Sequence, residues 1–198
     1  MFLSRIFVTE PKRARRNRHR DSALHQHRKH MEARMAGQNK KLEDLFHETL
    51  KDIYYAEKKI LVALPKMAKA VNSEELRAAF EKHVEETHGQ VERIQQVFKL
   101  LKQPAKGKTC PAILGLVEEG EEVMEEFEDS EALDAGLLSG AQAVEHYEIS
   151  RYGTLIAWAE QLGMPEAATL LTQTLEEEKK TDAALSKLAK AAINQMAA

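Results

Sequence analysis

The sequence predicts an all-α fold, a four-helix bundle with one long crossover that carries a short extra helix. Its 198 residues are 43% hydrophobic but only 6% aromatic, which suits one helical domain better than a sheet. Apolar residues recur three and four positions apart in four long segments, as they do along the buried seam of a bundle helix. Two connections are short, whereas residues 104–130 separate the second and third segments, so one crossover is long.

Charge divides the chain into a basic tail, residues 1–38, and a bundle domain, residues 39–198. Residues 1–41 hold twelve Lys/Arg and three Asp/Glu, a charge of +9, and the remainder carries −12. The tail has little apolar periodicity, so we expect it to be largely disordered. Three interpretations of it stay open: weak contact with nucleic acid, a targeting sequence, or a passive extension upstream of a start at Met35.

Cysteine content and hydropathy indicate the compartment. The single cysteine, Cys110, excludes an internal disulfide and a thiolate metal cluster. The chain has no apolar run near the roughly 20 residues that span a bilayer. We therefore expect a soluble, cytoplasmic protein that has no membrane partner.

The first two helices are expected from residue 40 to Val71 and from Asn72 to Gln103. Residues 72–75 resemble a capping box, and Pro104 ends the second helix. The first seam, with spacing 4,3,4,3,4,3,4, is Phe46, Leu50, Ile53, Glu57, Ile60, Leu64, Met67 and Val71. The second is Leu76, Phe80, Val84, Val91, Ile94, Phe98 and Leu101.

The crossover and the last two helices follow from similar signals. Residues 112–128 are amphipathic and rich in Glu, and we expect a short crossover helix on the surface there. Ser130 can cap the third long helix, which ends at Gly163, and Pro165 opens the fourth. The third seam is Leu138, Ala141, Glu145, Glu148, Tyr152, Leu155, Ala159 and Leu162, and the fourth is Leu171, Leu175, Glu178, Asp182, Leu185 and Ala189.

Seven polar residues fall on or beside these seams, where leucine would be expected. They are Glu57, Glu85, His88, Glu145, Glu148, Glu178 and Asp182. A carboxylate inside a bundle is costly unless it is protonated, paired or bound to metal, and the seams hold no lysine or arginine. At about 1.5 Å rise per residue, these positions lie at one level of the bundle. The pattern predicts a metal site; the alternative is a polar layer that fixes the register of the helices.

The same stretches resemble the YciE/YciF family of ferritin-like domains, which are related to rubrerythrins, over about residues 38–190. The resemblance rests on residues 54–57 (Tyr-Tyr-Ala-Glu), 85–88 (Glu-Glu-Thr-His), 145–148 (Glu-His-Tyr-Glu) and 175–182. It implies a ferritin-like bundle with a dinuclear site, usually iron, in bacterial proteins associated with stress responses.

The types of ligand indicate which metal the site would bind. Hard oxygen donors suit two iron ions, with manganese as the alternative. Six carboxylates exceed the charge of two divalent ions, so either some of them do not touch the metal or the site favours trivalent ions. Glu178 and Asp182 are the least secure ligands, and Asp182 is the one that we would first assign outside the ligand set. Tyr54 and Tyr152 lie close enough along the helices to hydrogen-bond a ligand, although each also suits the core. The remaining bundle histidines, His47, His83 and His146, fall off the seams, and we expect them at the surface.

Two classes of function follow. The first is an oxidoreductase, a di-iron oxidase, peroxidase or catalase-like enzyme, that consumes peroxide or oxygen in a stressed cell. The second is a protein without turnover, which sequesters iron or manganese or acts as a structural stress protein. A homodimer fits the first class, whereas a hollow 12-mer or 24-mer fits storage. An enzyme that needs an electron donor would take it from another protein, because the bundle is not followed by rubredoxin-like cysteine pairs.

Overall fold

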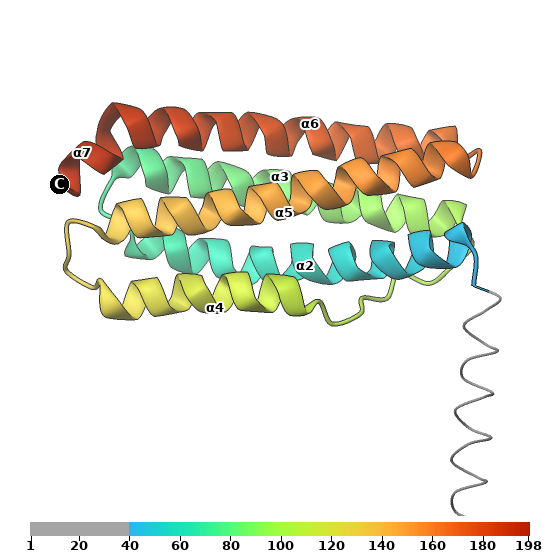
Figure 1. Ribbon diagram of the computed structural model, residues 1–198, viewed down its shortest axis with the longest axis horizontal. Helices are drawn as coiled ribbons and strands as arrows, with labels where there is room; N and C mark the ends of the chain where they lie inside the picture. Colours follow the sequence, from blue (N-terminus) through green and yellow to red (C-terminus); the bar gives the residue numbers. More distant parts are fainter. Residues whose placement is uncertain (1–39) are drawn as a thin grey trace, which may run out of the picture. The chain divides into compact units, whose positions relative to one another are not determined.

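A computed structural model describes residues 40–198 of the chain, and the regular secondary structure of this part is helical (Figure 1). The predictions for the basic tail fall outside the described residues. Four long helices form a bundle, a shorter helix occupies the crossover, and two short segments end the chain. Their order is α2 (Leu42–Ala70), α3 (Glu74–Leu100), α4 (Pro111–Glu126), α5 (Leu133–Gln161), α6 (Pro165–Leu188), η1 (Ala189–Ile193, a π-helical segment) and α7 (Asn194–Met196). The predicted all-α bundle with one long crossover is confirmed.

Short turns join the two pairs of neighbouring helices. Ser73 is the N-cap of α3, and its hydroxyl accepts a hydrogen bond from the backbone N–H of Leu76 at 3.2 Å, which satisfies one unpaired donor of the first turn. Between α5 and α6, Gly163 has φ of 70°, a left-handed conformation that glycine adopts without strain. Pro165 then opens α6.

The predicted seams of α2 and α5 form the centre of the core. Every residue of the first predicted seam, from Phe46 on α2 to Val71 just after its end, is buried, including Glu57. On α5, the seam residues from Leu138 to Ala159 are buried, and Leu162 is partly exposed. Most of the burial is apolar and supplies the driving force for folding, so the buried carboxylates in these seams need a separate explanation.

The inward face of α3 differs from the prediction in its middle turns. From Leu76 and Phe80 the spacing of four and three continues through His83, Thr87 and Gln90, and all five residues are buried. Val84 and Val91, which we placed on the seam, are only half-buried. The centre of α3 therefore faces the core with polar side chains.

The inward face of α6 is displaced from the prediction by one residue at two positions. Thr174 and Thr181 are buried, whereas Leu175 and Asp182 are half-buried. Glu178 lies between the two threonines and is completely buried. On α6, the prediction was thus correct for Glu178 and wrong for Asp182 as a core position.

The crossover helix α4 lies beside α2 and α5, as Figure 1 shows. Its buried residues are Ile113 and Gly120, so most of the helix surface is in contact with solvent, as expected. In the described part of the chain, no helix is both long enough and apolar enough to cross a membrane.

Candidate metal centre

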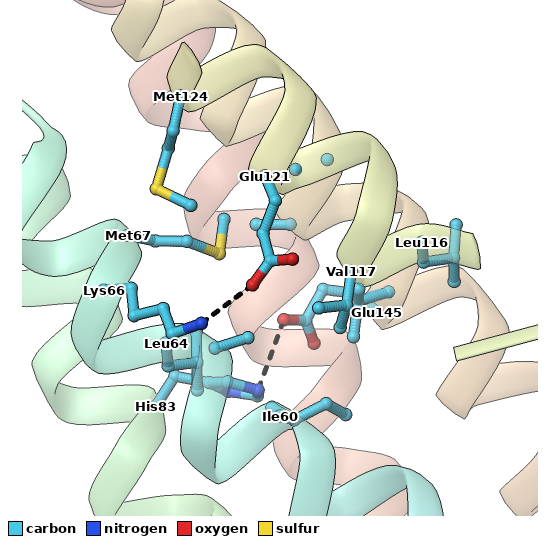
Figure 2. A pocket seen from close by; sticks show the side chains of 15 residues that line it. Ile60, Leu64, Lys66, Met67, His83, Leu116, Val117, Glu121, Met124 and Glu145 are labelled. Carbon is cyan, nitrogen blue, oxygen red and sulfur yellow. Dashed lines mark hydrogen bonds and ion pairs between the residues drawn. The ribbon is translucent and has the colours of Figure 1, made fainter. Parts of the chain in front are cut away.

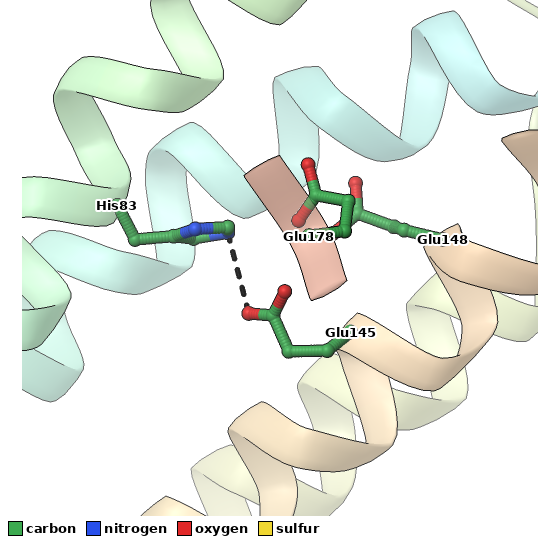
Figure 3. A group of neighbouring side chains, drawn as sticks. All are labelled: His83, Glu145, Glu148 and Glu178. Atoms are coloured by element: carbon green, nitrogen blue, oxygen red, sulfur yellow. Dashed lines mark ion pairs between the residues drawn. The ribbon is translucent and has the colours of Figure 1, made fainter. Parts of the chain in front are cut away.

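Four buried side chains from three helices converge at the middle of the bundle (Figure 3). They are His83 of α3, Glu145 and Glu148 of α5, and Glu178 of α6. Each offers a nitrogen or oxygen atom that could hold a metal ion, and these atoms lie within 4.8 Å of one another. The exposed fraction is at most 2% for each of the four.

Periodicity on α5 places two of these carboxylates. Glu145 and Glu148 are three residues apart, so they project from the same face of the helix. The next seam residue is Tyr152, which is fully buried and donates a hydrogen bond from its hydroxyl to Oε1 of Glu57 on α2. This hydrogen bond joins α5 to Glu57 on α2. The sequence left two roles open for Tyr152, a hydrogen bond to a ligand or a place in the core, and the structure shows a buried side chain that is bonded to Glu57.

A second polar contact holds Glu178. The side-chain amide of Gln90, which is fully buried on α3, donates to Oε1 of Glu178. Nearby, Arg93 is engaged elsewhere, since it donates to the hydroxyl of Thr174 at 2.9 Å and pairs with Glu177. Gln90 was not predicted; its position on the α3 seam is the signal that would have identified it.

For His83, the prediction from the sequence was wrong. We expected it at the surface, but it is 2% exposed, and its Nε2 lies 3.5 Å from Oε1 of Glu145. Burial lowers the pKa of the His83 imidazole to about 4, because the charged form loses its hydration. The ring is therefore neutral at physiological pH and retains a lone pair for a metal ion.

Buried polar atoms at this centre lack hydrogen-bond partners within the described protein. They are Oε2 of Glu57, both ring nitrogens of His83, Oε2 of Glu145, both carboxylate oxygens of Glu148, and Oε2 of Glu178, together with Oε1 of Gln90. Leaving one such group unpaired costs about 1–3 kcal/mol, and more if it is charged. So many together indicate a site that is completed by another group.

The electrostatics of the carboxylates follow from burial. Burial raises the pKa of Glu148 well above its usual value, and the negative charges of Glu57 and Glu178 raise it further. Burial is also the main cause of the raised pKa of Glu57, of Glu145 and of Glu178. Carboxyl groups in this state are either protonated or neutralised by a cation.

The donor set fits metal ions that prefer oxygen and imidazole ligands. Glu57 joins the four converging residues as a fifth candidate, because it is completely buried and its Oε2 has no partner. Four carboxylates and one neutral imidazole carry −4, which equals the charge of two divalent ions. The seven residues predicted from sequence carried a surplus of negative charge, so the observed set is the better match.

Three of the seven predicted ligands are not brought together with the others. Glu85 and His88 are exposed on α3, so the prediction that they face the core is wrong. They are two and five residues past His83, and neither offset returns to the inward face. Asp182 is half-buried, and its Oδ1 accepts a hydrogen bond from the side-chain amide of Gln142 at 3.0 Å. The same oxygen lies 3.3 Å from Nε2 of His146.

Tyr54, the other predicted neighbour of the site, is a buried residue of α2. It is 7% exposed, packs edge-on against Phe98 and accepts a hydrogen bond from Gln95 at 3.2 Å. Its hydrogen bond and its ring contacts among the described residues are with Gln95, Phe98 and Lys58. It acts here as a packed core residue.

Comparison with known proteins gives consistent matches over the bundle. Residues 41–198 match the family described as "Domain of unknown function (DUF892)". The chain is 50% identical to Protein YciF of Escherichia coli (strain K12) over 159 residues, which cover 80% of this chain and 96% of YciF. All five candidate ligands fall within the matched family region.

Solved structures agree with this fold. The crystal structure of the E. coli stress protein YciF is similar with a TM-score of 0.75 and 50% identity, covering 79% of this chain and 99% of YciF. A second structure is that of YcfI of Rhodopseudomonas palustris, to which its description provisionally assigns a structural role. Its TM-score is 0.73 and its sequence identity is 49%, covering 74% of this chain and 94% of YcfI. A protein of Xanthomonas campestris has a TM-score of 0.60 and a sequence identity of 23%, covering 78% of this chain and 94% of its own. At this identity the match supports the fold alone.

Proposed function

The chain belongs to the DUF892 family, and we propose that its acidic centre binds two metal ions and that the loaded protein reacts with dioxygen or peroxide. The observation that carries the proposal is the group of buried, unpartnered donor atoms on Glu57, His83, Glu145, Glu148 and Glu178. Iron is the first choice and manganese the alternative, because carboxylate ligands suit these ions better than they suit copper, and better than the thiolate and imidazole sites of zinc.

The side chains around the centre would orient the ligands. The Tyr152 hydroxyl fixes one oxygen of Glu57, and the Gln90 amide fixes one oxygen of Glu178. Each leaves the second oxygen of its carboxylate free. Ligands held in this way keep their geometry and need no rearrangement when an ion enters. The bound metal pair would supply the two electrons that reduce dioxygen or peroxide.

The cellular role is proposed by analogy. The relative YciF is described as a stress protein, and a centre that removes oxidants would suit such a role. We propose that this chain acts in the cytoplasm as a homodimer whose reaction partner is a small oxidant. Measurement of size in solution tests the assembly, since a dimer fits an enzyme and a 12-mer or 24-mer fits storage.

The second candidate is a protein without turnover, which sequesters metal or only supports structure. The description of the relative YcfI favours the structural version. A purely structural polar layer would pair its charges, yet no lysine or arginine of the described residues forms an ion pair with Glu57, Glu148 or Glu178. A layer of unpaired carboxylates is a poor structural device, and for this reason we favour the metal centre.

Elemental analysis of the purified full chain tests the proposal. After anaerobic loading with Fe(II), we expect about two ions per chain, as in carboxylate sites of helical bundles. His83→Ala and Glu148→Ala should each lose most of this metal while they keep their helicity. The matched control is His88→Ala, an exposed histidine of the same helix, which should keep it. No metal in the natural protein, or full metal in both centre variants, would overturn the site.

A further inference from the structure

A narrow pocket separates the crossover helix from the bundle and ends at the acidic centre (Figure 2). It lies between α2, α4 and α5, and its volume is about 40 Å³, room for at least one small molecule. Most of the lining side chains are apolar. They include Ile60, Leu64, Met67, Val117, Met124 and Val144.

The inner end of this pocket is polar. His83 and Glu145, two of the candidate ligands, line it. Both are 2% exposed, and Oε2 of Glu145 and both ring nitrogens of His83 have no hydrogen-bond partner in the described protein. The pocket therefore reaches the candidate metal centre, which is otherwise enclosed by the packed helices.

The outer end lies where α4 meets α2. Lys66 of α2 and Glu121 of α4 form an ion pair of 2.8 Å, with side chains 54% and 47% exposed. In Figure 2 this pair is drawn between the His83–Glu145 contact and the side chains of Met67 and Met124. Methionine side chains are unbranched and adaptable, so a small molecule can pass them with little rearrangement.

Two helical glycines keep the pocket open. Gly120 on α4 and Gly140 on α5 both line it, and a Cβ atom added to either would meet no other atom within 4 Å. Glycine inside a helix costs about 0.5–1 kcal/mol relative to alanine, and neither position needs glycine to avoid a clash. Their effect in the fold is to leave space at this place.

We propose that the pocket is the path by which dioxygen reaches the acidic centre, an inference that rests on the proposed function. Dioxygen is small and apolar, so it enters an apolar cavity without losing hydrogen bonds, whereas peroxide must give up its hydration to do so. The proposal thus selects dioxygen over peroxide as the oxidant that this chain admits.

Xenon tests the path without any metal reaction, because xenon occupies apolar cavities of this kind. In xenon-pressurised crystals of the full chain, we expect one xenon atom between α2, α4 and α5. Gly120→Leu should remove it by filling the space. The matched control is Gly115→Leu, on the same helix, where an added Cβ also meets nothing within 4 Å but the residue does not line the pocket. Gly140→Leu provides a second blocking variant from α5 if Gly120→Leu does not fold.

Rapid mixing of the Fe(II)-loaded chain with each oxidant supplies the second readout. We expect Gly120→Leu to slow oxidation by dioxygen about tenfold, to affect oxidation by peroxide much less, and to keep the metal content of the natural chain. Gly115→Leu should match the natural chain. Absence of metal from the natural chain would overturn the proposed function. Full metal content with no xenon in the pocket, an unchanged dioxygen rate or equal slowing by both oxidants would overturn the path alone.

Discussion

The bundle buries carboxylates at two places, and their surroundings are opposite. At one end, Asp134 of α5 is 6% exposed, and its two oxygens accept hydrogen bonds from the backbone N–H groups of Asn72 and Ser73 at 2.8 and 2.7 Å. At the middle, Glu148 is fully buried, and neither of its oxygens has a partner in the described protein. Burial is common to both, whereas hydrogen-bond satisfaction separates them.

This difference separates a carboxylate with structural partners, Asp134, from Glu148, which we propose binds metal. Asp134 lies at the N-terminus of α3, where free N–H groups and the helix dipole stabilise a negative charge. It therefore anchors the turn between α2 and α3 to α5. The carboxylate of Glu148 has no such partner, so it destabilises the fold until something else neutralises it. Opposite effects on stability are expected when the two side chains are removed.

The largest effect is expected from Asp134→Ala. The variant loses two hydrogen bonds between backbone N–H groups and a buried carboxylate, so unfolding by urea should show a loss of about 2–3 kcal/mol. Metal content per chain should not change, because the residue lies outside the centre. Asp134→Asn, which keeps one acceptor oxygen, should fall between. A loss below about 0.5 kcal/mol would mean that the hydrogen bonds of Asp134 do not stabilise the fold, so that Asp134 would not differ from Glu148 in this respect.

Glu148→Leu should act in the opposite direction on the metal-free protein. Replacement of a buried, unpaired carboxylate by an apolar side chain of similar size is expected to stabilise the bundle by about 1–2 kcal/mol. The same variant should bind little Fe(II) in elemental analysis. A clear destabilisation of the metal-free protein would mean that Glu148 has a structural partner, as Asp134 has.

The stability of the metal-free protein should also depend on pH. Burial raises the pKa of Glu57 to about 8 and that of Glu145 to about 7, above the values of the unfolded chain. Between pH 5 and pH 8 the folded state thus binds more protons than the unfolded state, and its stability falls as pH rises.

Thermal unfolding across this range measures the trend with and without metal. In the loaded protein the trend should reverse, since metal binding requires deprotonated carboxylates and neutral histidine. Stability of the metal-free protein that increases from pH 5 to pH 8 would contradict the burial of uncompensated carboxyl groups at the centre.

The sequence predicted the bundle and four of the five candidate ligands. On α2 and α5, apolar residues occur three or four positions before and after each glutamate, so the seam could be traced through Glu57, Glu145 and Glu148. On α6, Leu171 and Leu185 define the face that contains Glu178. In each helix the apolar neighbours fix which way the carboxylate points.

The middle of α3 could not be assigned in this way, because its buried positions are polar. We assigned Val84 and Val91 to the inward seam because they are apolar. This assignment rotated the predicted inward face and placed Glu85 and His88 on it. Strict continuation of the spacing of four and three from Leu76 and Phe80 leads instead to His83, Thr87 and Gln90. Hydrophobic periodicity is least informative where a helix passes a functional site, since that site replaces the apolar residues.

The smallest effect is expected from the two residues that the sequence placed inward and the structure places outside. Glu85→Ala and His88→Ala remove exposed side chains of α3, and exposed substitutions usually change stability by less than about 0.5 kcal/mol. Metal content should stay at that of the natural chain in both variants, measured beside His83→Ala. Loss of metal from His88→Ala with retention in His83→Ala would show that α3 presents its other face to the centre. That result would mean that His88, and not His83, faces the core. The difference between carboxylates with and without hydrogen-bond partners, on which the site rests, would then no longer hold.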